Sequence, residues 1–213
     1  TDKYVFFPYK IHDGIAESVT LAELQKKYPL TYKYVTDNEK EFKKRESGKG
    51  GKLPCWYAYI YQKNLTKFEQ LKLTSMEICA DHPNVTINRD NLYHTTKAYS
   101  WVKRADVKEP YEYLLAIANS PVIWWFLKLT GDTLQGDART FKTEYLNPFP
   151  LPEKVSKKDE KKIVDAVNEI LLIKEKEPEA DVSEKEAALN KMVYDLYELN
   201  DDEVKIIESA NRM

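Results

Sequence analysis

Three prolines fall within five residues, at Pro148, Pro150 and Pro152, and they constrain the fold more than any other feature of the sequence. Each proline fixes its own φ angle and restricts the residue before it, so the segment is predicted to be extended. Neither a helix nor a central strand can continue through it. We therefore expect a hinge here that divides the chain into a body, residues 1–152, and a helical tail, residues 153–213.

The body and the tail differ in charge and in aromatic content. Residues 1–152 hold 22 Lys and Arg against 18 Asp and Glu, whereas residues 153–213 hold 11 against 17. Of the 26 aromatic residues, 24 lie before residue 153. A basic, aromatic-rich body favours contact with a polyanion, and the acidic tail does not.

The tail carries the clearest helical pattern in the sequence. Apolar residues recur at helical spacing over residues 163–171 and again over residues 189–197. Ser183 followed by Glu186 predicts that the second helix begins with a capping box. A third, short helix is predicted from Asp201. This pattern indicates an antiparallel helical unit.

The body mixes strand and helix patterns, so the predicted fold class is α+β. Helices are predicted over residues 20–28 and 38–46, and two more over residues 109–129, broken at Asn119-Ser120-Pro121. Glycines and lysines at residues 47–52 predict a mobile loop. Short β-prone runs predict strands near residues 3–10, 55–61, 72–78, 84–87 and 93–101.

Several classes of protein are disfavoured by the residues that the chain contains. Cys55 and Cys79 are the only cysteines, which excludes a disulfide framework and fits a reducing cytoplasm. No apolar run approaches the roughly 20 residues that cross a bilayer, so no membrane partner is expected. His12, His82 and His94 have no neighbouring carboxylate cluster in the sequence, so we assign no metal site and no catalytic residue.

Seven short segments follow one another in an order and spacing that are specific as a set. They are Phe7-Pro8-Tyr9, residues 28–32, Lys44-Arg45, residues 56–59, residues 114–120, residues 136–139 and residues 145–152. Together they resemble the C-terminal target-recognition domain of Type IIG restriction–modification enzymes, relatives of the Taq-type adenine-specific DNA methyltransferases. Tyr61-Gln62-Lys63 departs from the pattern, because an arginine is common there.

The resemblance implies a bacterial, cytoplasmic fragment that binds double-stranded DNA and reads its sequence in the major groove. Its second partner would be a methyltransferase domain of the same parent chain. The sequence lacks an N-P-P-Y-like segment and a glycine-rich loop after a strand, so S-adenosylmethionine and catalysis are expected in that domain. No cofactor is expected in this fragment. The start at Thr1 rather than Met fits a piece of a longer protein.

The predicted DNA contacts are basic and tyrosine side chains. Lysine and arginine pair with phosphates, and arginine also reads guanine through two parallel hydrogen bonds. The candidates are Lys43, Lys44, Arg45, Lys49, Lys52, Tyr57, Tyr59, Tyr61, Lys63, Arg139 and Lys142. A strand over residues 55–61 would place the three tyrosines on one face.

Plainer interpretations of these residues stay open. The lysines could form a solvated loop, the tyrosines could be core, and Arg139 could form an ordinary salt bridge with Asp137. For the whole chain, the alternative to DNA recognition is a protein-interaction or scaffold domain that uses the C-terminal helices.

Overall fold

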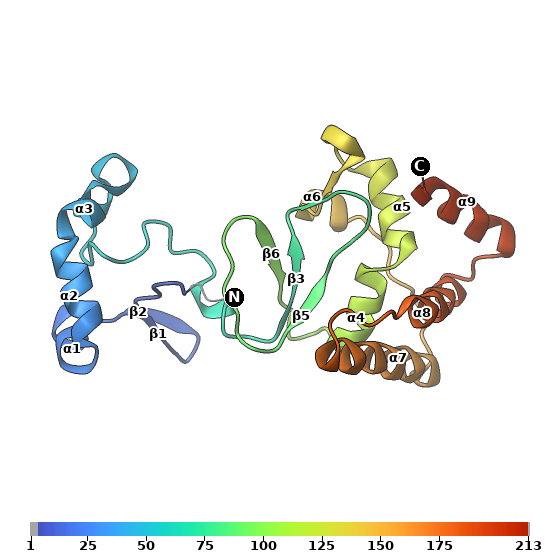
Figure 1. The fold of residues 1–213 in the computed structure, drawn as a ribbon, viewed down its shortest axis with the longest axis horizontal. Coiled ribbons are helices and arrows are strands. Elements are labelled where there is room, and N and C mark those ends of the chain that lie inside the picture. The colour runs from blue at the N-terminus through green and yellow to red at the C-terminus, as the bar shows by residue number, and fades with distance from the viewer. Residues whose placement is uncertain (1–3, 213) are drawn as a thin grey trace. The chain divides into compact units, whose positions relative to one another are not determined.

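The computed structural model describes residues 4–212 and divides the chain into two compact units, unit 1 up to Gln70 and unit 2 from Leu71 (Figure 1). Both units contain helices together with short antiparallel strands, so the α+β fold class is confirmed. Lys3, the first residue of the strand predicted over residues 3–10, lies outside the described residues.

Unit 1 opens with a β-hairpin of β1 (Tyr9–His12) and β2 (Ile15–Ser18), which are antiparallel with Tyr9 opposite Ser18. Asp13 and Gly14 join the two strands, and both have positive φ angles. An Asp-Gly pair in this conformation forms the tight turn whose twist matches that of a hairpin. The predicted strand therefore begins later than expected, at Tyr9, and continues to the turn.

Three helices follow in unit 1: α1 (Leu21–Lys27), α2 (Pro29–Asp37) and α3 (Glu39–Gly48). The helix predicted over residues 20–28 is confirmed, and the Thr20 hydroxyl accepts a hydrogen bond from the Glu23 N–H at 3.2 Å. Pro29 ends α1 as predicted, but it also occupies the first turn of α2, where its missing N–H removes no helical hydrogen bond. For this reason α2 is not predicted from the sequence.

The strand predicted over residues 55–61 is wrong, because these residues form turns. Tyr57 and Ala58 are neighbours, yet they are only 3% and 0% exposed, so the two-residue alternation of a strand fails. The Trp56 and Ala58 carbonyls accept hydrogen bonds from the Arg45 guanidinium rather than from a neighbouring strand. Tyr57 joins the core of unit 1 with Val35.

The prediction that residues 47–52 form a mobile loop that does not pack is also wrong. Gly50 is buried, and residues 50–52 form a turn of 3₁₀ helix against α3. A Cβ atom at Gly50 would overlap the carbonyl oxygen of Phe42. Glycine is used here because the two backbones approach closely, and not because the segment is loose.

Unit 2 contains two small antiparallel sheets. Strands β3 (Lys72–Met76), β5 (Thr86–Asn88) and β6 (Ala98–Trp101) form one sheet in the order β5-β3-β6. In the other sheet, β4 (Ile78–Cys79) pairs with β7 (Arg139–Thr140). The strands predicted over residues 72–78, 84–87 and 93–101 are confirmed only in part. The first is divided into β3 and β4, which lie in different sheets, the second forms at Thr86–Asn88, and the third is limited to Ala98–Trp101.

Two adjoining helices and a shorter one belong to the middle of unit 2: α4 (Tyr111–Ala118), α5 (Pro121–Thr130) and α6 (Thr143–Leu146). The predicted break after α4 is confirmed. Ser120 caps α5, since its hydroxyl accepts a hydrogen bond from the Ile123 N–H at 3.4 Å and donates one to the Ile117 carbonyl at 2.8 Å.

The three helices predicted in the tail are confirmed as α7 (Lys157–Lys176), α8 (Ser183–Leu196) and α9 (Asp201–Arg212). The capping box predicted at Ser183 is wrong, because the carboxylate of Asp181 accepts the Ser183 N–H at 2.9 Å.

A reciprocal capping box occurs instead before α9, between Asn200 and Glu203. The Asn200 side chain accepts the Glu203 N–H at 3.1 Å, and the Glu203 carboxylate accepts the Asn200 N–H at 2.9 Å. Asparagine is among the preferred helix caps, and the glutamate three residues later completes the motif.

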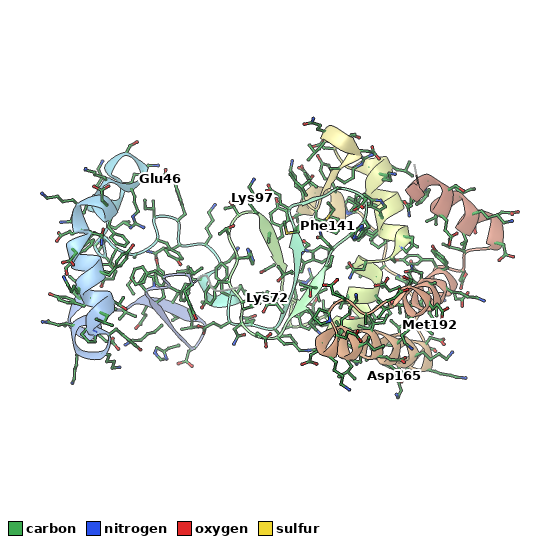
Figure 2. All side chains as sticks on the ribbon, in the orientation of Figure 1. Glu46, Lys72, Lys97, Phe141, Asp165 and Met192 are labelled. Atoms are coloured by element: carbon green, nitrogen blue, oxygen red, sulfur yellow. The ribbon has the colours of Figure 1, made fainter. Side chains whose placement is uncertain are left out.

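The tail helices share one hydrophobic core with the rest of unit 2. One buried cluster contains Ile163, Val167 and Val193 of the tail together with Leu115 of α4 and Phe141. Phe141 is labelled in Figure 2. The compact units thus divide at Gln70–Leu71, and not at the boundary between residues 152 and 153 that the sequence predicts. A separate function for residues 153–213 stays a prediction.

The proline-rich segment is held in place and does not form the free hinge that the sequence predicted. The Phe149 ring packs 5.2 Å from the Phe126 ring and 6.0 Å from the Tyr197 ring, measured between centroids. The Tyr197 hydroxyl also donates a hydrogen bond to the Pro150 carbonyl at 2.9 Å. An extended backbone accepts such contacts as readily as it forms a linker.

Between residues 4 and 212, no helix combines the length and the apolar character needed to cross a lipid bilayer.

Candidate functional site

Unit 1 has a net excess of basic over acidic residues. Residues 1–70 hold 13 Lys and Arg against 9 Asp and Glu, whereas residues 71–152 hold 9 of each kind. The basic excess found for residues 1–152 therefore belongs entirely to unit 1. Nine of the eleven predicted DNA contacts lie in this unit, and Arg139 and Lys142 lie in unit 2.

Arg45 connects helix α3 to the turn residues that follow the glycines. Its Nε donates a hydrogen bond to the Phe42 carbonyl at 2.9 Å, and its Nη2 donates to the Trp56 and Ala58 carbonyls at 2.9 and 2.8 Å. The guanidinium also lies 4.9 Å from the centroid of the Phe42 ring. Because three of its five N–H donors bind backbone carbonyls, Arg45 positions this surface.

Tyr57 and Tyr59 are likewise occupied inside unit 1. The Tyr57 hydroxyl donates a hydrogen bond to the Val19 carbonyl, and burial raises the pKa of this phenol. The Tyr59 hydroxyl donates to the Phe6 carbonyl at 2.7 Å, and burial raises its pKa as well. These contacts favour the alternative in which Tyr57 and Tyr59 belong to the core.

The remaining candidates in unit 1 have exposed side chains, which we call the lysine surface. Its members are Lys43, Lys44, Lys49, Lys52, Tyr61 and Lys63. Lys49 and Tyr61 meet directly, because the Lys49 ammonium donates a hydrogen bond to the Tyr61 hydroxyl at 3.1 Å and lies 5.5 Å from the ring centroid. This hydrogen bond raises the pKa of Lys49, so the lysine keeps its charge at neutral pH.

The lysines of this surface differ in how far their charge is already neutralised. Lys43 pairs with Glu39 at 2.5 Å and Lys44 pairs with Glu41 at 3.2 Å, in both cases along helix α3. Lys49, Lys52 and Lys63 make no ion pair with a carboxylate within the described part of the chain. These three lysines therefore carry the charge that is most available to an anionic partner.

Arg139 is placed as a structural residue in unit 2. Its side chain is only 5% exposed, and Nη1 donates hydrogen bonds to the Asp137 carboxylate at 3.0 Å and to the Asp137 carbonyl at 2.6 Å. Nη2 reaches the Lys128 carbonyl in the last turn of α5, at 3.4 Å, where a cation is favoured. The hydrogen bond from Arg139 lowers the pKa of Asp137. Arg139 therefore forms the salt bridge with Asp137 that was the alternative to a DNA contact.

Lys142 is more exposed, but it lies between two carboxylates. Its ammonium is 3.6 Å from the Asp132 carboxylate and 3.8 Å from the Glu144 carboxylate. Both Arg139 and Lys142 lie in unit 2, so neither belongs to the lysine surface.

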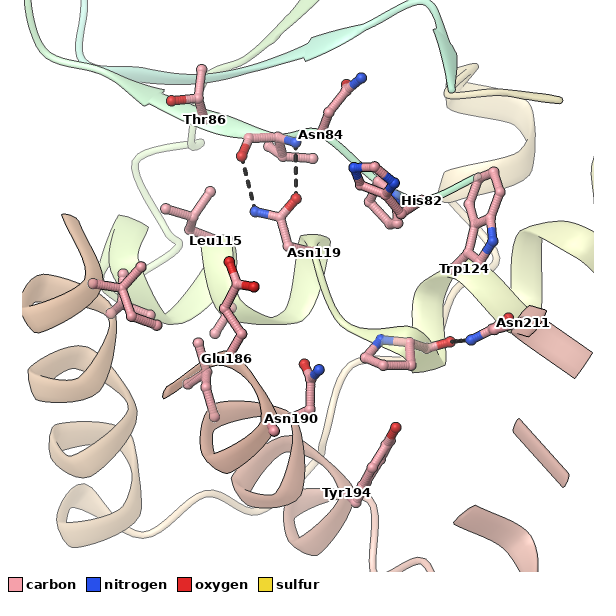
Figure 3. Close-up of a pocket in the computed structure, with 18 of the residues that line it drawn as sticks. His82, Asn84, Thr86, Leu115, Asn119, Trp124, Glu186, Asn190, Tyr194 and Asn211 are labelled. Atoms are coloured by element: carbon pink, nitrogen blue, oxygen red, sulfur yellow. Dashed lines mark hydrogen bonds between the residues drawn. The ribbon is translucent and has the colours of Figure 1, made fainter. Parts of the chain in front are cut away.

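Unit 2 also contains a pocket of about 720 Å³ that the sequence analysis did not predict (Figure 3). Its walls come from the segment before β5 and from five helices, α4, α5, α7, α8 and α9. The volume falls in the range typical of small-molecule sites. The lining includes apolar groups such as Leu115, Ala116, Val167 and Leu171, and polar groups such as His82, Asn119, Glu186, Asn190 and Glu208.

Asn119 holds the edge of this pocket in place. Its Oδ1 accepts the Val85 N–H at 2.9 Å and its Nδ2 donates to the Val85 carbonyl at 2.9 Å, as the dashed lines in Figure 3 show. This pair of bonds ties the strand segment to the end of α4. Asn119 was expected only as a helix breaker, and its position after α4 is what brings its amide to Val85.

Two buried polar atoms in side chains that line the pocket have no hydrogen-bond partner within residues 4–212. They are Nε1 of Trp124 and Oδ1 of Asn211. A buried polar group without a partner costs about 1–3 kcal/mol, so such atoms mark places where a partner is missing. The Trp124 side chain is buried, and sequence periodicity says nothing about a partner for its indole N–H.

Within the described residues, no group of three or more His, Cys, Asp or Glu is arranged to hold a metal ion. No protein-family model matches the chain, and no curated protein is significantly similar to it in sequence.

Proposed function

We propose that this chain is the DNA target-recognition fragment of a Type II restriction enzyme or N6-adenine DNA methyltransferase. It would position duplex DNA for a methyltransferase domain of the same parent chain, where S-adenosylmethionine serves catalysis in a bacterial cytoplasm. The order of the seven sequence segments supports the proposal. The observation that carries it is the lysine surface, where the exposed side chains of Lys49, Lys52 and Lys63 have no carboxylate partner among the described residues and Lys49 contacts the exposed Tyr61.

The lysine surface has the chemistry of a phosphate-binding site. Lysine ammonium groups neutralise phosphates and release counterions, which provides affinity without sequence selectivity. Arg45 holds residues 56–58 against α3, so the surface beside Lys49 and Tyr61 is formed before DNA binds. Preorganisation of this kind lowers the entropy lost on binding. Contacts with phosphates set the register of the duplex, and base contacts then supply specificity.

The test is a titration of the chain with duplex DNA at several salt concentrations. Replacing Lys49, Lys52 and Lys63 by Ala should weaken binding and reduce the slope of log K against log salt by up to about 3, since each phosphate contact contributes about 0.9. The matched control replaces Lys157, Lys161 and Lys205, three exposed lysines of α7 and α9 that remove the same charge. The control should leave the slope within about 1 of the parent value.

Two results would contradict the proposal. One is the absence of binding even at low salt, and the other is a triple variant that behaves like its control.

In the alternative, the chain is a protein-interaction or scaffold domain that uses the C-terminal helices. Ile163, Val167 and Val193 of these helices are buried in the core of unit 2. We therefore keep DNA recognition as the proposed function.

A further inference from the structure

Tyr61 and Lys49 contact each other on the lysine surface in a way that leaves the tyrosine ring open to solvent. The Lys49 ammonium lies 3.1 Å from the Tyr61 hydroxyl oxygen and 5.5 Å from the ring centroid, so it lies beyond the hydroxyl at the edge of the ring. It therefore covers neither face of the ring. Tyr61 is 59% exposed, and no other aromatic ring among residues 4–212 contacts it. The ring thus presents an exposed π-face beside a cation.

The Lys49 ammonium keeps hydrogen-bond donors for a second partner. An ammonium carries three N–H donors, and the Tyr61 hydroxyl accepts one of them. The Lys49 side chain is exposed, and it forms no ion pair with a carboxylate among the residues that the structure describes. A phosphate-binding group therefore lies at the edge of an exposed aromatic ring.

Both side chains are attached to backbone that unit 1 holds in place. Lys49 precedes Gly50, which is buried against α3. Tyr61 follows Tyr59, whose N–H donates a hydrogen bond to the Tyr9 hydroxyl at 2.6 Å. The ring and the cation are thus brought together across 12 positions of the sequence before a ligand binds, which lowers the entropy lost on binding.

An exposed ring beside a cation has the chemistry of a site for one nucleotide. Every base has a π-face that stacks on an aromatic side chain, and the phosphate of the same nucleotide pairs with a lysine. In a fully paired duplex each base is stacked between its neighbours, so its faces are closed to a protein side chain. An unpaired base that has left the stack offers such a face.

We propose that Tyr61 and Lys49 form a subsite for a single unpaired nucleotide of DNA. The base stacks on the Tyr61 ring, and the phosphate of the same nucleotide contacts the Lys49 ammonium. The subsite rests on the proposed function and makes it more specific, because lysine–phosphate contacts alone do not read whether a base is paired.

The experiment compares three duplexes of one sequence. The first is fully paired, the second carries a single unpaired thymidine, and the third carries an abasic nucleotide in place of that thymidine. The last two have the same backbone charge and differ only in the base. The full chain should bind the thymidine duplex at least about fivefold more tightly than the abasic duplex, as expected for stacking of one base on an aromatic ring. Stacking releases no counterions, so this ratio should not change with salt concentration.

Substitutions separate the contribution of the ring from that of the cation. Tyr61→Ala should reduce the ratio to about one, whereas Tyr61→Phe keeps the ring and should stay within about twofold of the parent ratio. Lys49→Ala should weaken binding of all three duplexes and lower the slope of log K against log salt by about 0.9. Tyr28→Ala is the matched control, because Tyr28 is 54% exposed in the same unit, and it should leave the ratio unchanged.

Equal binding of the thymidine and abasic duplexes would overturn the subsite, and so would a ratio that survives Tyr61→Ala. The proposed function would still stand if the paired duplex were bound with a salt dependence that requires Lys49, Lys52 and Lys63. If none of the three duplexes is bound at low salt, the subsite and the proposed function are both wrong.

Discussion

At the scale of single residues, the two arginines singled out from the sequence both serve the fold. Arg45 and Arg139 each bind several backbone carbonyls, and Arg139 adds the Asp137 carboxylate. A guanidinium presents five donors in a planar arrangement, which suits carbonyl groups at the end of a helix or in a turn as well as it suits phosphates. The residue type is the same in both uses, so only the contacts distinguish them.

Arg139→Ala is expected to destabilise the protein by about 2–3 kcal/mol, because it removes hydrogen bonds between a buried charge and acceptors that would be left unsatisfied. Denaturant unfolding measures this loss. Lys142→Ala, a more exposed neighbour, should cost about 0.5 kcal/mol or less. The slope of log K for DNA binding against log salt should be unchanged in both variants. A reduced slope in Arg139→Ala, with stability unaltered, would indicate that Arg139 contacts DNA.

The glycines of residues 48–51 allow a sharper comparison. Gly50→Ala is expected to cost about 1–3 kcal/mol, since the added Cβ overlaps the Phe42 carbonyl and forces the backbone to shift. Gly51→Ala places its Cβ 3.4 Å from the Lys43 Cβ, so it should cost about 0.5 kcal/mol or less. Unfolding of the two variants by urea measures the difference. Equal stabilities would mean that residues 50–52 are as mobile as the sequence suggested.

At the scale of elements, local signals predicted helices well and strands unevenly. Thr20 and the Ser120-Pro121 pair mark the starts of α1 and α5 through contacts within one turn. Residues 55–61 have strand-like composition but no partner strand, because Arg45 takes up the carbonyls of Trp56 and Ala58. A strand exists only with a neighbour, so its prediction depends on residues far away in the sequence.

Two buried tyrosines on helices of unit 2 predict loss of stability at alkaline pH. Burial raises the pKa of Tyr113 on α4 and of Tyr194 on α8 to about 12, above the ordinary value of 10.0. Above pH 10 the unfolded chain releases these protons while the folded chain retains them, so stability present below pH 10 is lost as pH rises toward 12. The loss should approach about 1.4 kcal/mol per pH unit for each tyrosine.

Unfolding free energies measured from pH 9 to pH 12 test this slope. Tyr194→Phe should reduce the slope by up to about 1.4 kcal/mol per pH unit relative to the parent chain. A slope that is unchanged in Tyr194→Phe would show that this tyrosine ionises equally in both states.

At the scale of the whole molecule, the cores divide the chain differently from the composition. Charge and aromatic content change at the proline-rich segment, yet Val167 and Val193 of the tail pack in one cluster with Leu115 and Phe141. Unit 1 has its own smaller clusters, around Val35 and around Ala58. Composition reports on surfaces as well as cores, so a change in composition need not coincide with a boundary between cores.

Two truncated chains distinguish the two boundaries. Residues 71–213 should fold cooperatively, because they contain the complete hydrophobic cluster of unit 2. Residues 71–152 should not, since they lack Ile163, Val167 and Val193 and would expose the apolar faces that these residues cover. Dispersion of amide NMR signals is the measurement. A well-dispersed spectrum for residues 71–152 would support the boundary at residue 152 instead.

Sequence alone determined the α+β class, most of the helices, the break at Asn119-Ser120-Pro121 and the excess of basic residues in the first part of the chain. These features depend on periodicity, helix capping and charge, which are properties of neighbouring residues. Tertiary structure decided which basic residues are exposed, that Tyr57 and Arg139 are buried, and that Trp124 and Asn211 come together in a pocket. Burial and hydrogen-bond partners depend on segments that are distant in sequence, and no local pattern contains that information.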